Sequence, residues 1–328
     1  MDIIKRTNVM TGRNLPGRGN MISVLITVYN LADDVDSLHV SLKEALTQTG
    51  RKFELVFIDD GSTDQTRKRL QEIAGRHKSV RVVRLRSTFG EGTALQAGLD
   101  HSRGEEIVYL SGRVRVNPSD IPGLLERLSD KTDFVVGWRN PRRDSLLNRF
   151  VSRAFNRMVN VMSRMRLHDI NSGIFVTRRS VLDRLTFYGD LYNFLPVLAC
   201  QQGYRVSEEK IEQLPGAFRN SRNPKAYLRR LLDIITVFFL TRYSKKPIHF
   251  LGFVGMIFFL MGLGIEIYLF IYRILEMGAI AGRPLLLLGA LMLVIGIQMI
   301  SIGLLGEMMI FTHAGDIAEY NIEEIINP

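Results

Sequence analysis

The chain has 328 residues, a formal net charge of +10 and a single cysteine, Cys200. One cysteine excludes an intrachain disulfide and a cysteine-rich metal site. The positive charge suits an anionic partner, and a phosphorylated metabolite or an acidic membrane surface is favoured over nucleic acid because no nucleic-acid-binding motif is present. The chain joins a soluble part, up to about residue 246, to a part that is apolar enough for lipid.

Residues 1–20 are polar and basic. They contain no apolar stretch of the kind found in a secretory signal peptide. Their glycine, proline and arginine content predicts a loosely packed leader.

Residues 21–138 alternate short apolar runs with segments whose apolar residues recur at helical spacing. The runs predict strands at residues 21–28, 53–58, 80–85, 106–110 and 134–138. The segments between them predict helices at residues 32–46, 66–75, 93–101 and 121–128. Strands that alternate with helices predict an α/β domain with a largely parallel sheet covered on both faces.

Three of the predicted strands end in polar residues, which are Tyr29-Asn30, Asp59-Asp60 and Ser111-Gly112-Arg113. Ligands of such sheets bind beyond the carboxyl ends of the strands. Carboxylates there can accept hydrogen bonds from a base edge and from ribose hydroxyls, and the N–H groups at the next helix start can meet phosphate. The sequence therefore predicts a binding site at this edge of the sheet.

Residues 145–167 combine apolar residues at helical spacing with five arginines, which predicts a cationic amphipathic helix. Such a helix is typical of a membrane interface. It also fits a helix that packs on the soluble core with its arginines in water, and the sequence leaves both interpretations open. A second basic stretch covers residues 219–230.

Two later segments, residues 250–272 and 284–306, are long and apolar enough to span a bilayer. The connection between them is too short for a domain, so the spans are expected to form a hairpin whose outer ends share one side. Basic residues precede the first span: Arg229, Arg230, Arg242, Lys245 and Lys246. The positive-inside rule then predicts a cytoplasmic large domain. Arg273 and Arg283 in the connection reduce the excess of basic residues on that side without reversing it. Glu266, within the first span, is expected to face a partner helix or another subunit.

The strand-end motifs also carry a resemblance to a known family. Ile26-Thr-Val-Tyr-Asn30 and Phe57-Ile-Asp-Asp-Gly-Ser-Thr-Asp64 resemble the nucleotide-binding start of family-2 glycosyltransferases with the GT-A fold. Further segments resemble the same family: residues 89–98, 135–139, 168–173, 239–247 and 303–307. The last two are similar to the membrane section of the polyisoprenyl-phosphate branch, which includes bacterial undecaprenyl-phosphate sugar transferases and relatives of dolichyl-phosphate mannose synthase.

This resemblance implies an α/β architecture in which a cytosolic GT-A domain, Rossmann-like with a mostly parallel sheet, precedes a C-terminal two-helix transmembrane hairpin. The implied parts of the chain follow in order. They are a leader (1–20), a GT-A glycosyltransferase-like domain (21–215), basic juxtamembrane helices (216–247), two transmembrane helices (248–312) and a cytosolic tail (313–328).

The resemblance also implies an activity, in which a sugar moves from a nucleotide diphosphate to the phosphate of a polyprenyl lipid at the cytoplasmic face of the cell (inner) membrane. The expected partners are a nucleotide sugar, a polyprenyl phosphate, the lipid bilayer and further copies of the chain, without nucleic acid. Because the acceptor phosphate is already an anion, catalysis is expected to depend on in-line positioning and on neutralising the leaving diphosphate.

Individual residues take roles by the same resemblance. Asp169 is expected to orient or deprotonate the acceptor, with a helix or turn cap as its alternative role. The expected nucleotide-binding residues are Thr27, Tyr29, Asn30, Asp59, Asp60, Gly61 and Ser62. The expected contacts of the donor diphosphate are Ser111, Arg113, Arg115 and Arg139. The expected contacts of the acceptor phosphate are Arg219, Arg222 and Lys225.

The sequence departs from the family at the metal site. Relatives carry an Asp-x-Asp pair after the fourth strand, whereas this chain has Ser111, Gly112 and Arg113 there. Serine and arginine cannot replace the anionic oxygen ligands that Mg²⁺ or Mn²⁺ prefers. The sequence therefore predicts no metal ligands, although the family leads one to expect Mg²⁺ or Mn²⁺.

Two hypotheses follow from this departure. In the first, Arg113, helped by Arg115, contacts the diphosphate directly in place of the metal, because guanidinium groups bind phosphate in a bidentate manner. In the second, the chain is a catalytically silent membrane subunit that binds a nucleotide, a lipid or a partner enzyme. The acceptor motif is altered as well, since its usual Ser-Lys-Tyr ending reads Lys225-Ala226-Tyr227.

Overall fold

The structure is a computed structural model that describes residues 21–112, 116–129, 131–141, 156, 160, 167–185, 189–214, 247–279 and 283–313. The chain divides into two compact units, Met1–Arg229 and Arg230–Pro328. Most of the predicted amphipathic helix lies outside the described residues. The same holds for the leader, the juxtamembrane segment up to residue 246 and the tail from residue 314.

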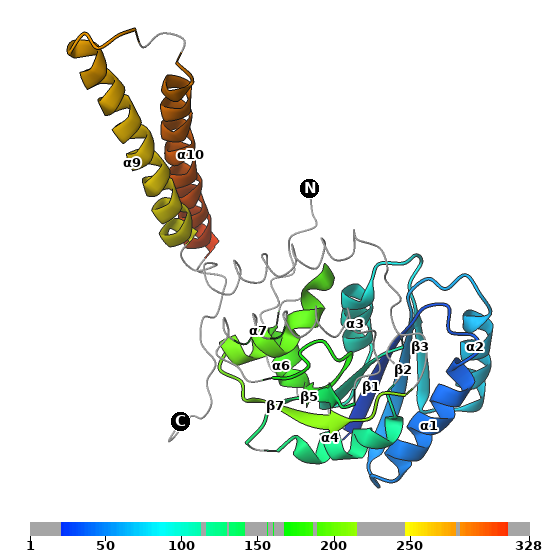
Figure 1. The fold of residues 1–328 in the computed structure, drawn as a ribbon. Coiled ribbons are helices and arrows are strands. Elements are labelled where there is room, and N and C mark those ends of the chain that lie inside the picture. Colours follow the sequence, from blue (N-terminus) through cyan, green and yellow to red (C-terminus); the bar gives the residue numbers. More distant parts are fainter. Residues whose placement is uncertain are drawn as a thin grey trace. The chain divides into compact units, whose positions relative to one another are not determined.

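A seven-stranded sheet forms the centre of the first unit (Figure 1). Its strands are β1 (Met21–Val28), β2 (Lys52–Asp59), β3 (Val80–Arg84), β4 (Glu106–Ser111), β5 (Phe134–Arg139), β6 (Ile174–Arg178) and β7 (Val206–Ile211). They lie in the order β3-β2-β1-β4-β6-β5-β7, and β4 is the middle strand. Only β6 runs antiparallel to its neighbours among these strands, which confirms the predicted mostly parallel sheet.

Helices cover both faces of this sheet (Figure 1). They are α1 (Val35–Thr47), α2 (Thr66–Arg76), α3 (Glu91–Asp100), α4 (Ile121–Arg127), α6 (Arg179–Arg184) and α7 (Leu195–Gln201), with 3-10 turns η1 (Pro118–Asp120) and η2 (Gly189–Phe194). Alternate β1 residues such as Ile22 and Val24 pack with Val35 of α1 and Leu124 of α4 in one core cluster. On the opposite face α3 approaches so closely that a Cβ at Gly98 would lie 2.7 Å from Ile58 Cδ1.

The five predicted strands and four predicted helices are confirmed, with shifts at their ends. The helix predicted at residues 32–46 begins at Val35, and the helix predicted at 93–101 begins at Glu91, two residues earlier than expected. Both faces of the central strands are buried, so their sequences are continuous apolar runs. These runs make the strands predictable from the sequence.

Two long apolar helices make up the described part of the second unit, α9 (Pro247–Ile274) and α10 (Pro284–His313). Both are long and apolar enough to cross a membrane, and only 17% and 11% of their most apolar stretches are buried. A core helix of a soluble protein would be mostly buried, so this exposure favours lipid as the surrounding medium. Both helices extend beyond the predicted spans.

Glycines allow α9 and α10 to pack closely. A Cβ at Gly255 of α9 would lie 2.7 Å from the carbonyl oxygen of Gly296 on α10, and a Cβ at Gly262 would lie 2.8 Å from that of Gly289. Small residues of this kind let helix backbones approach in membranes. The Glu266 carboxyl also lies against Gly289, where a Cβ would come within 2.6 Å of Oε1, so Glu266 faces the partner helix as expected.

Candidate active site

The ends of β1 and β2 are joined by hydrogen bonds into one rigid edge. The Asn30 backbone N–H donates to Ser62 Oγ at 3.0 Å, and the Thr63 N–H donates to Asn30 Oδ1 at 2.9 Å. Gly61 has a φ of 73°, and a Cβ there would lie 2.7 Å from the backbone carbon of Ser87. Predicted nucleotide-binding residues at the ends of these two strands are therefore brought together, and the turn that follows β2 requires glycine.

Both aspartates of the Asp59-Asp60 pair are buried. Asp59 Oδ1 accepts a hydrogen bond from the Ser62 N–H at 2.9 Å, while Asp59 Oδ2 lies 3.7 Å from Arg84 Nε. Asp60 accepts from the N–H groups of Phe89 and Gly90, at 2.8 and 3.0 Å. Asp60 thus ties β2 to the start of α3, and the contact of either carboxylate with a nucleotide stays a prediction.

A cluster of hydroxyl groups surrounds Glu91, the first residue of α3. Ser111 Oγ donates to Glu91 Oε1 at 2.9 Å, Tyr109 OH donates to Oε2 at 3.4 Å, and Tyr192 OH also donates to Oε2. Tyr109 OH lies 3.3 Å from Thr27 Oγ1. We call Thr27, Glu91, Tyr109, Ser111 and Tyr192 the Glu91 cluster.

Burial differs sharply within the Glu91 cluster. Its four hydroxyl residues are buried, while Glu91 is half-buried and keeps access to solvent. Burial, the Glu91 charge and Tyr192 raise the pKa of Tyr109 well above its ordinary value, so Tyr109 remains a neutral donor. The cluster was missed in the sequence because it joins residues from β1, α3, β4 and η2.

Asp169 and Arg139 form a buried ion pair. Arg139 Nε and Nη2 donate to Asp169 Oδ2 and Oδ1 at 2.6 and 3.0 Å, and Nη2 also donates to the carbonyl of Asn171 at 3.1 Å. The side chains are 2% and 1% exposed. The sequence assigned Arg139 to the donor diphosphate and Asp169 to the acceptor, whereas the structure brings the two residues together. Their substrate contacts stay predictions.

The segment before Asp169 is held from several sides. Asn156 and Asn160 donate from their side-chain amides to the carbonyls of His168 and Leu167. The His168 ring stacks on Trp138, the only tryptophan in the chain, with centroids 4.2 Å apart, and Glu208 accepts from the His168 N–H at 2.7 Å. The His168 side chain is nevertheless 61% exposed, in contrast to the buried pair beside it.

The residues at the expected metal position do not fit a divalent cation. Within the described parts of the chain, no group of three or more His, Cys, Asp or Glu side chains could hold a metal. Ser111 is the last residue of β4 and Gly112 follows it, and a Cβ at position 112 would lie 2.5 Å from the carbonyl oxygen of Thr27, so no larger side chain fits there. The nearby carboxylate of Glu91 already accepts hydrogen bonds from three hydroxyls.

Several predicted site residues lie outside the described residues. They are Arg113, Arg115, Arg219, Arg222 and Lys225. Their roles in binding the diphosphate or the acceptor stay predictions.

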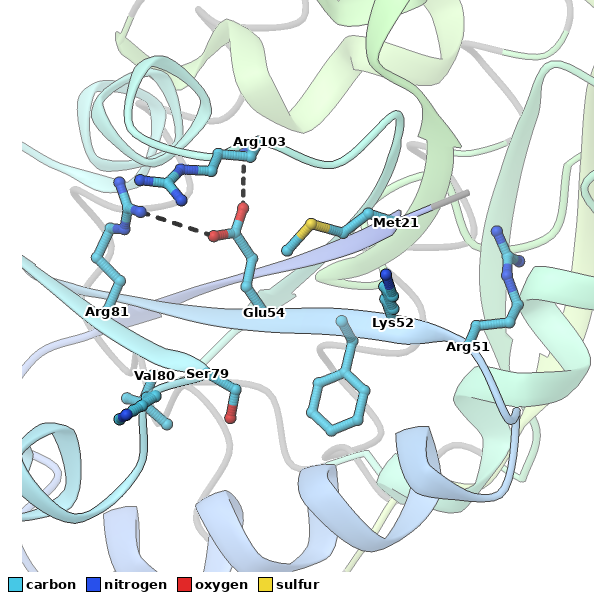
Figure 2. Close-up of a pocket in the computed structure, with 10 residues that line it drawn as sticks. Met21, Arg51, Lys52, Glu54, Ser79, Val80, Arg81 and Arg103 are labelled. Carbon is cyan, nitrogen blue, oxygen red and sulfur yellow. Dashed lines mark hydrogen bonds and ion pairs between the residues drawn. The ribbon is translucent and has the colours of Figure 1, made fainter. Parts of the chain in front are cut away.

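A hollow of about 590 Å³ lies near the amino ends of β2 and β3, and Figure 2 shows the residues that line it. Its lining contains five basic side chains: Arg51, Lys52, Lys78, Arg81 and Arg103. The carboxyl of Glu54 is buried among them, accepts from the Arg103 N–H and lies 4.0 Å from Arg81 Nη2 (Figure 2). The hollow lies at the edge opposite the polar strand ends, so we assign it no part in binding at the carboxyl edge.

Comparison with known proteins gives a consistent set of relatives. Residues 23–186 match the family described as Glycosyl transferase family 2. A dodecaprenyl-phosphate galacturonate synthase of Rhizobium johnstonii is 30% identical over 320 residues, which cover 94% of each protein. An undecaprenyl-phosphate 4-deoxy-4-formamido-L-arabinose transferase of Pseudomonas paraeruginosa is 30% identical over 293 residues, 88% of this chain and 85% of that protein.

Solved structures share the fold at lower identity. Glucosyl-3-phosphoglycerate synthase from Mycobacterium tuberculosis in complex with UDP has a TM-score of 0.54 and 19% identity, over 68% of this chain and 80% of that one. The same enzyme with Mn²⁺, UDP and phosphoglyceric acid has a TM-score of 0.54 and 21% identity, over 68% of this chain and 78% of that one. Relatives with this fold therefore bind Mn²⁺ in their structures.

Proposed function

The chain belongs to glycosyl transferase family 2, and from this premise we propose that it moves a sugar from a nucleotide-diphosphate sugar to a polyprenyl phosphate. The observation that carries the proposal is the galacturonate synthase match over 94% of both proteins, which includes the two apolar helices as well as the sheet. The polar carboxyl edge of β1, β2 and β4 supports a nucleotide-sugar site.

The proposed reaction is a single displacement at the anomeric carbon of the sugar. An oxygen of the acceptor phosphate forms a bond to this carbon, and the bond to the donor diphosphate breaks. The nucleoside diphosphate leaves with the electron pair. The acceptor oxygen already carries negative charge, so the protein must mainly align the two phosphates and stabilise the leaving one.

In this proposal the residues at the ends of β1 and β2 hold the nucleotide: Thr27, Tyr29, Asn30, Asp59, Asp60, Gly61 and Ser62. Ser111, Arg113, Arg115 and Arg139 bind the diphosphate, while Arg219, Arg222 and Lys225 bind the acceptor phosphate. Asp169 orients the acceptor. Its bidentate pairing with Arg139 supports a fixed orienting group over a mobile base.

We propose that the reaction proceeds without a bound metal. The chemistry of the described residues at the end of β4 supports this, since they offer neutral hydroxyl and backbone groups where a divalent cation prefers carboxylate oxygens. Neutralisation of the diphosphate then falls to arginine side chains, of which Arg113 is the first candidate.

We further propose that the protein is a multi-pass protein of the cell (inner) membrane with its large domain in the cytoplasm, and that it forms homo-oligomers. The basic residues before α9 support the orientation. Gln298 supports assembly, because it is exposed on α10 within an apolar helix and a polar side chain in lipid favours a partner.

A second candidate function is a catalytically silent subunit of the same fold. The observation that favours it is the engagement of all three motif aspartates, Asp59, Asp60 and Asp169, with groups of the protein itself. Such a subunit would bind a nucleotide or a lipid without turnover.

The test incubates the purified full chain in nanodiscs with undecaprenyl phosphate and a panel of UDP-, GDP- and other activated sugars, with and without EDTA. We expect transfer that survives EDTA and disappears in Arg113→Ala. Transfer that EDTA abolishes and Mg²⁺ restores would contradict metal independence alone. Nucleotide binding without transfer from any donor would favour the silent subunit.

A further inference from the structure

The hollow at the amino ends of β2 and β3 carries an excess of positive charge. Its volume of about 590 Å³ lies in the range of small-molecule sites. Its five basic residues outnumber the nearby carboxylates, which are Glu54 in the lining and Glu106, the partner of Arg51 at 2.8 Å. The hollow is therefore suited to a small ligand that carries negative charge.

The carboxyl of Glu54 holds one wall of the hollow in place. Glu54 Oε1 accepts from Ser23 Oγ at 2.6 Å and from the Arg103 N–H at 2.5 Å, and the side chain is 6% exposed. The Gly104 N–H donates to the same Ser23 hydroxyl at 2.7 Å. A Cβ at Gly104 would lie 2.5 Å from the Ser23 nitrogen, so the loop before β4 packs directly on β1. The backbone that carries Arg103 is thus fixed before any ligand binds.

Arg81 of β3 brings a second guanidinium to this wall. Arg81 Nη1 donates to the His101 carbonyl at 2.8 Å, and Nη2 lies 4.0 Å from Glu54 Oε2. Figure 2 shows the side chains of Arg81 and Arg103 pointing toward one another. Like charges repel, so this arrangement is favoured where an anion binds both groups. Guanidinium groups suit phosphate, which they bind through paired N–H donors.

Two lysines extend the positive charge around the hollow. Lys52 begins β2 and Lys78 precedes β3, and both are exposed. Within the described part of the chain neither lysine forms an ion pair, so their flexible ammonium groups are available to a ligand. Residues 1–20, which lead into β1, contain four basic residues and one carboxylate, so their composition supplies no compensating negative charge.

We propose that this hollow is a second anion site of the protein, which binds a small ligand through its phosphate groups. Arg81 and Arg103 hold one phosphate, while Lys52 and Lys78 neutralise the remaining charge of the ligand. The site lies at the edge of the sheet opposite the proposed transfer site and is independent of that reaction. A free phosphorylated metabolite and the headgroup of an anionic lipid share this chemistry, and the experiment distinguishes them.

The first test localises the bound phosphate by chemical modification of lysine. The full chain in detergent is acetylated with and without inorganic pyrophosphate or short-chain dioctanoyl phosphatidic acid, and peptides are quantified by mass spectrometry. We expect one of these probes to slow acetylation of Lys52 and Lys78 severalfold. Lys68, which is exposed on α2, is the internal control and should react at an unchanged rate. Protection by pyrophosphate alone assigns a free metabolite, protection by the lipid alone assigns a headgroup, and protection by neither overturns the inference.

A pair of matched variants tests the role of the charges. Lys52→Gln with Arg103→Gln removes two charges from the hollow, and Arg67→Gln with Lys68→Gln removes the same two types from exposed positions on α2. The first variant should bind the protecting probe about tenfold more weakly or worse, because two charged contacts with phosphate are lost. The second should bind it as the wild type does. Equal affinity of both variants and the wild type would contradict the proposed site.

Thermal unfolding separates ligand binding from a purely structural role. Basic residues near helix ends also offset the partial negative charge of the last carbonyls, and α2 ends just before Lys78. We expect the protecting probe to raise the unfolding temperature of the wild type but not that of Lys52→Gln with Arg103→Gln. A variant that unfolds earlier than the wild type and keeps its affinity would show a structural role alone and overturn the inference. No readout here uses sugar transfer, so failure of the proposed function leaves this inference standing.

Discussion

Asp169 and Glu91 are two carboxylates at the same edge of the sheet, and the protein holds them in different ways. Asp169 is 1% exposed and is paired by both oxygens with the guanidinium of Arg139. Glu91 is half-buried and accepts hydrogen bonds from the hydroxyls of Ser111, Tyr109 and Tyr192. The first carboxylate is neutralised by a guanidinium and shielded from water, whereas the second accepts hydrogen bonds from hydroxyls and keeps contact with solvent.

The largest expected effect comes from breaking the buried pair. Arg139→Met leaves Asp169 buried without its guanidinium, and removal of one partner from such a pair costs about 3–5 kcal/mol of folding free energy. Urea unfolding of the detergent-solubilised chain, followed by the emission of Trp138, measures this loss.

The double variant Arg139→Met with Asp169→Leu is the control for that loss. It removes both charges and should recover much of the stability, because apolar pairs often replace buried ion pairs without cost. Equal destabilisation of the single and double variants would show that the charge pairing is not what stabilises this site.

A smaller loss is expected from the Glu91 cluster. Tyr109→Phe removes the hydroxyl between Thr27 and Glu91 and should cost about 1–2 kcal/mol, the range for buried hydrogen bonds. Because burial raises the pKa of Tyr109, the folded state favours the neutral phenol, and this stabilisation is lost as pH rises above about 10, the ordinary pKa that tyrosine has in the unfolded chain. The free energy of unfolding of the wild type should therefore fall more steeply with pH in that range than that of Tyr109→Phe. If the two proteins lose stability in parallel above about pH 10, Tyr109 does not have the raised pKa assigned to it.

The smallest expected effect lies beside Asp169 on the surface. His168→Ala removes a stacked ring and an exposed contact with Glu208, which is worth about 1 kcal/mol or less. Trp138, the sole tryptophan, then loses the ring stacked on it and becomes more exposed to water. Its fluorescence emission should therefore shift to longer wavelength, while the midpoint of unfolding barely changes. An unchanged emission spectrum would show that the stack does not persist in solution.

Much of the fold was predictable because burial leaves apolar runs of characteristic length in the sequence. The central strands are apolar throughout since both faces are covered, and the spans of α9 and α10 are apolar over bilayer length. β7 was not predicted, since this edge strand carries Glu208, Glu209 and Lys210 in a run that lacks a buried face. β6, a strand of five residues, follows the segment 168–173 and was not separated from it.

Only those parts of the site that lie within one continuous stretch of the sequence were predictable. The Asp59-Asp60 turn and Asp169 were found from local motifs. The pairing of Asp169 with Arg139 joins residues 30 apart, and Tyr192 meets Glu91 across 101 positions, so both contacts depend on the tertiary fold. A glutamate after glycine at a helix start gives no local sign of three hydroxyl donors that arrive from elsewhere.

The central claim, sugar transfer to a polyprenyl phosphate, is tested most directly by identifying both products of one reaction. The full chain in nanodiscs receives undecaprenyl phosphate and the donor sugar that supports turnover, and the lipid and nucleotide products are weighed by mass spectrometry. We expect a lipid that carries the sugar on a single phosphate, formed in equal amount with a nucleoside diphosphate. A nucleoside monophosphate with a sugar on a lipid diphosphate, or no modified lipid with any donor of the panel, would contradict the account.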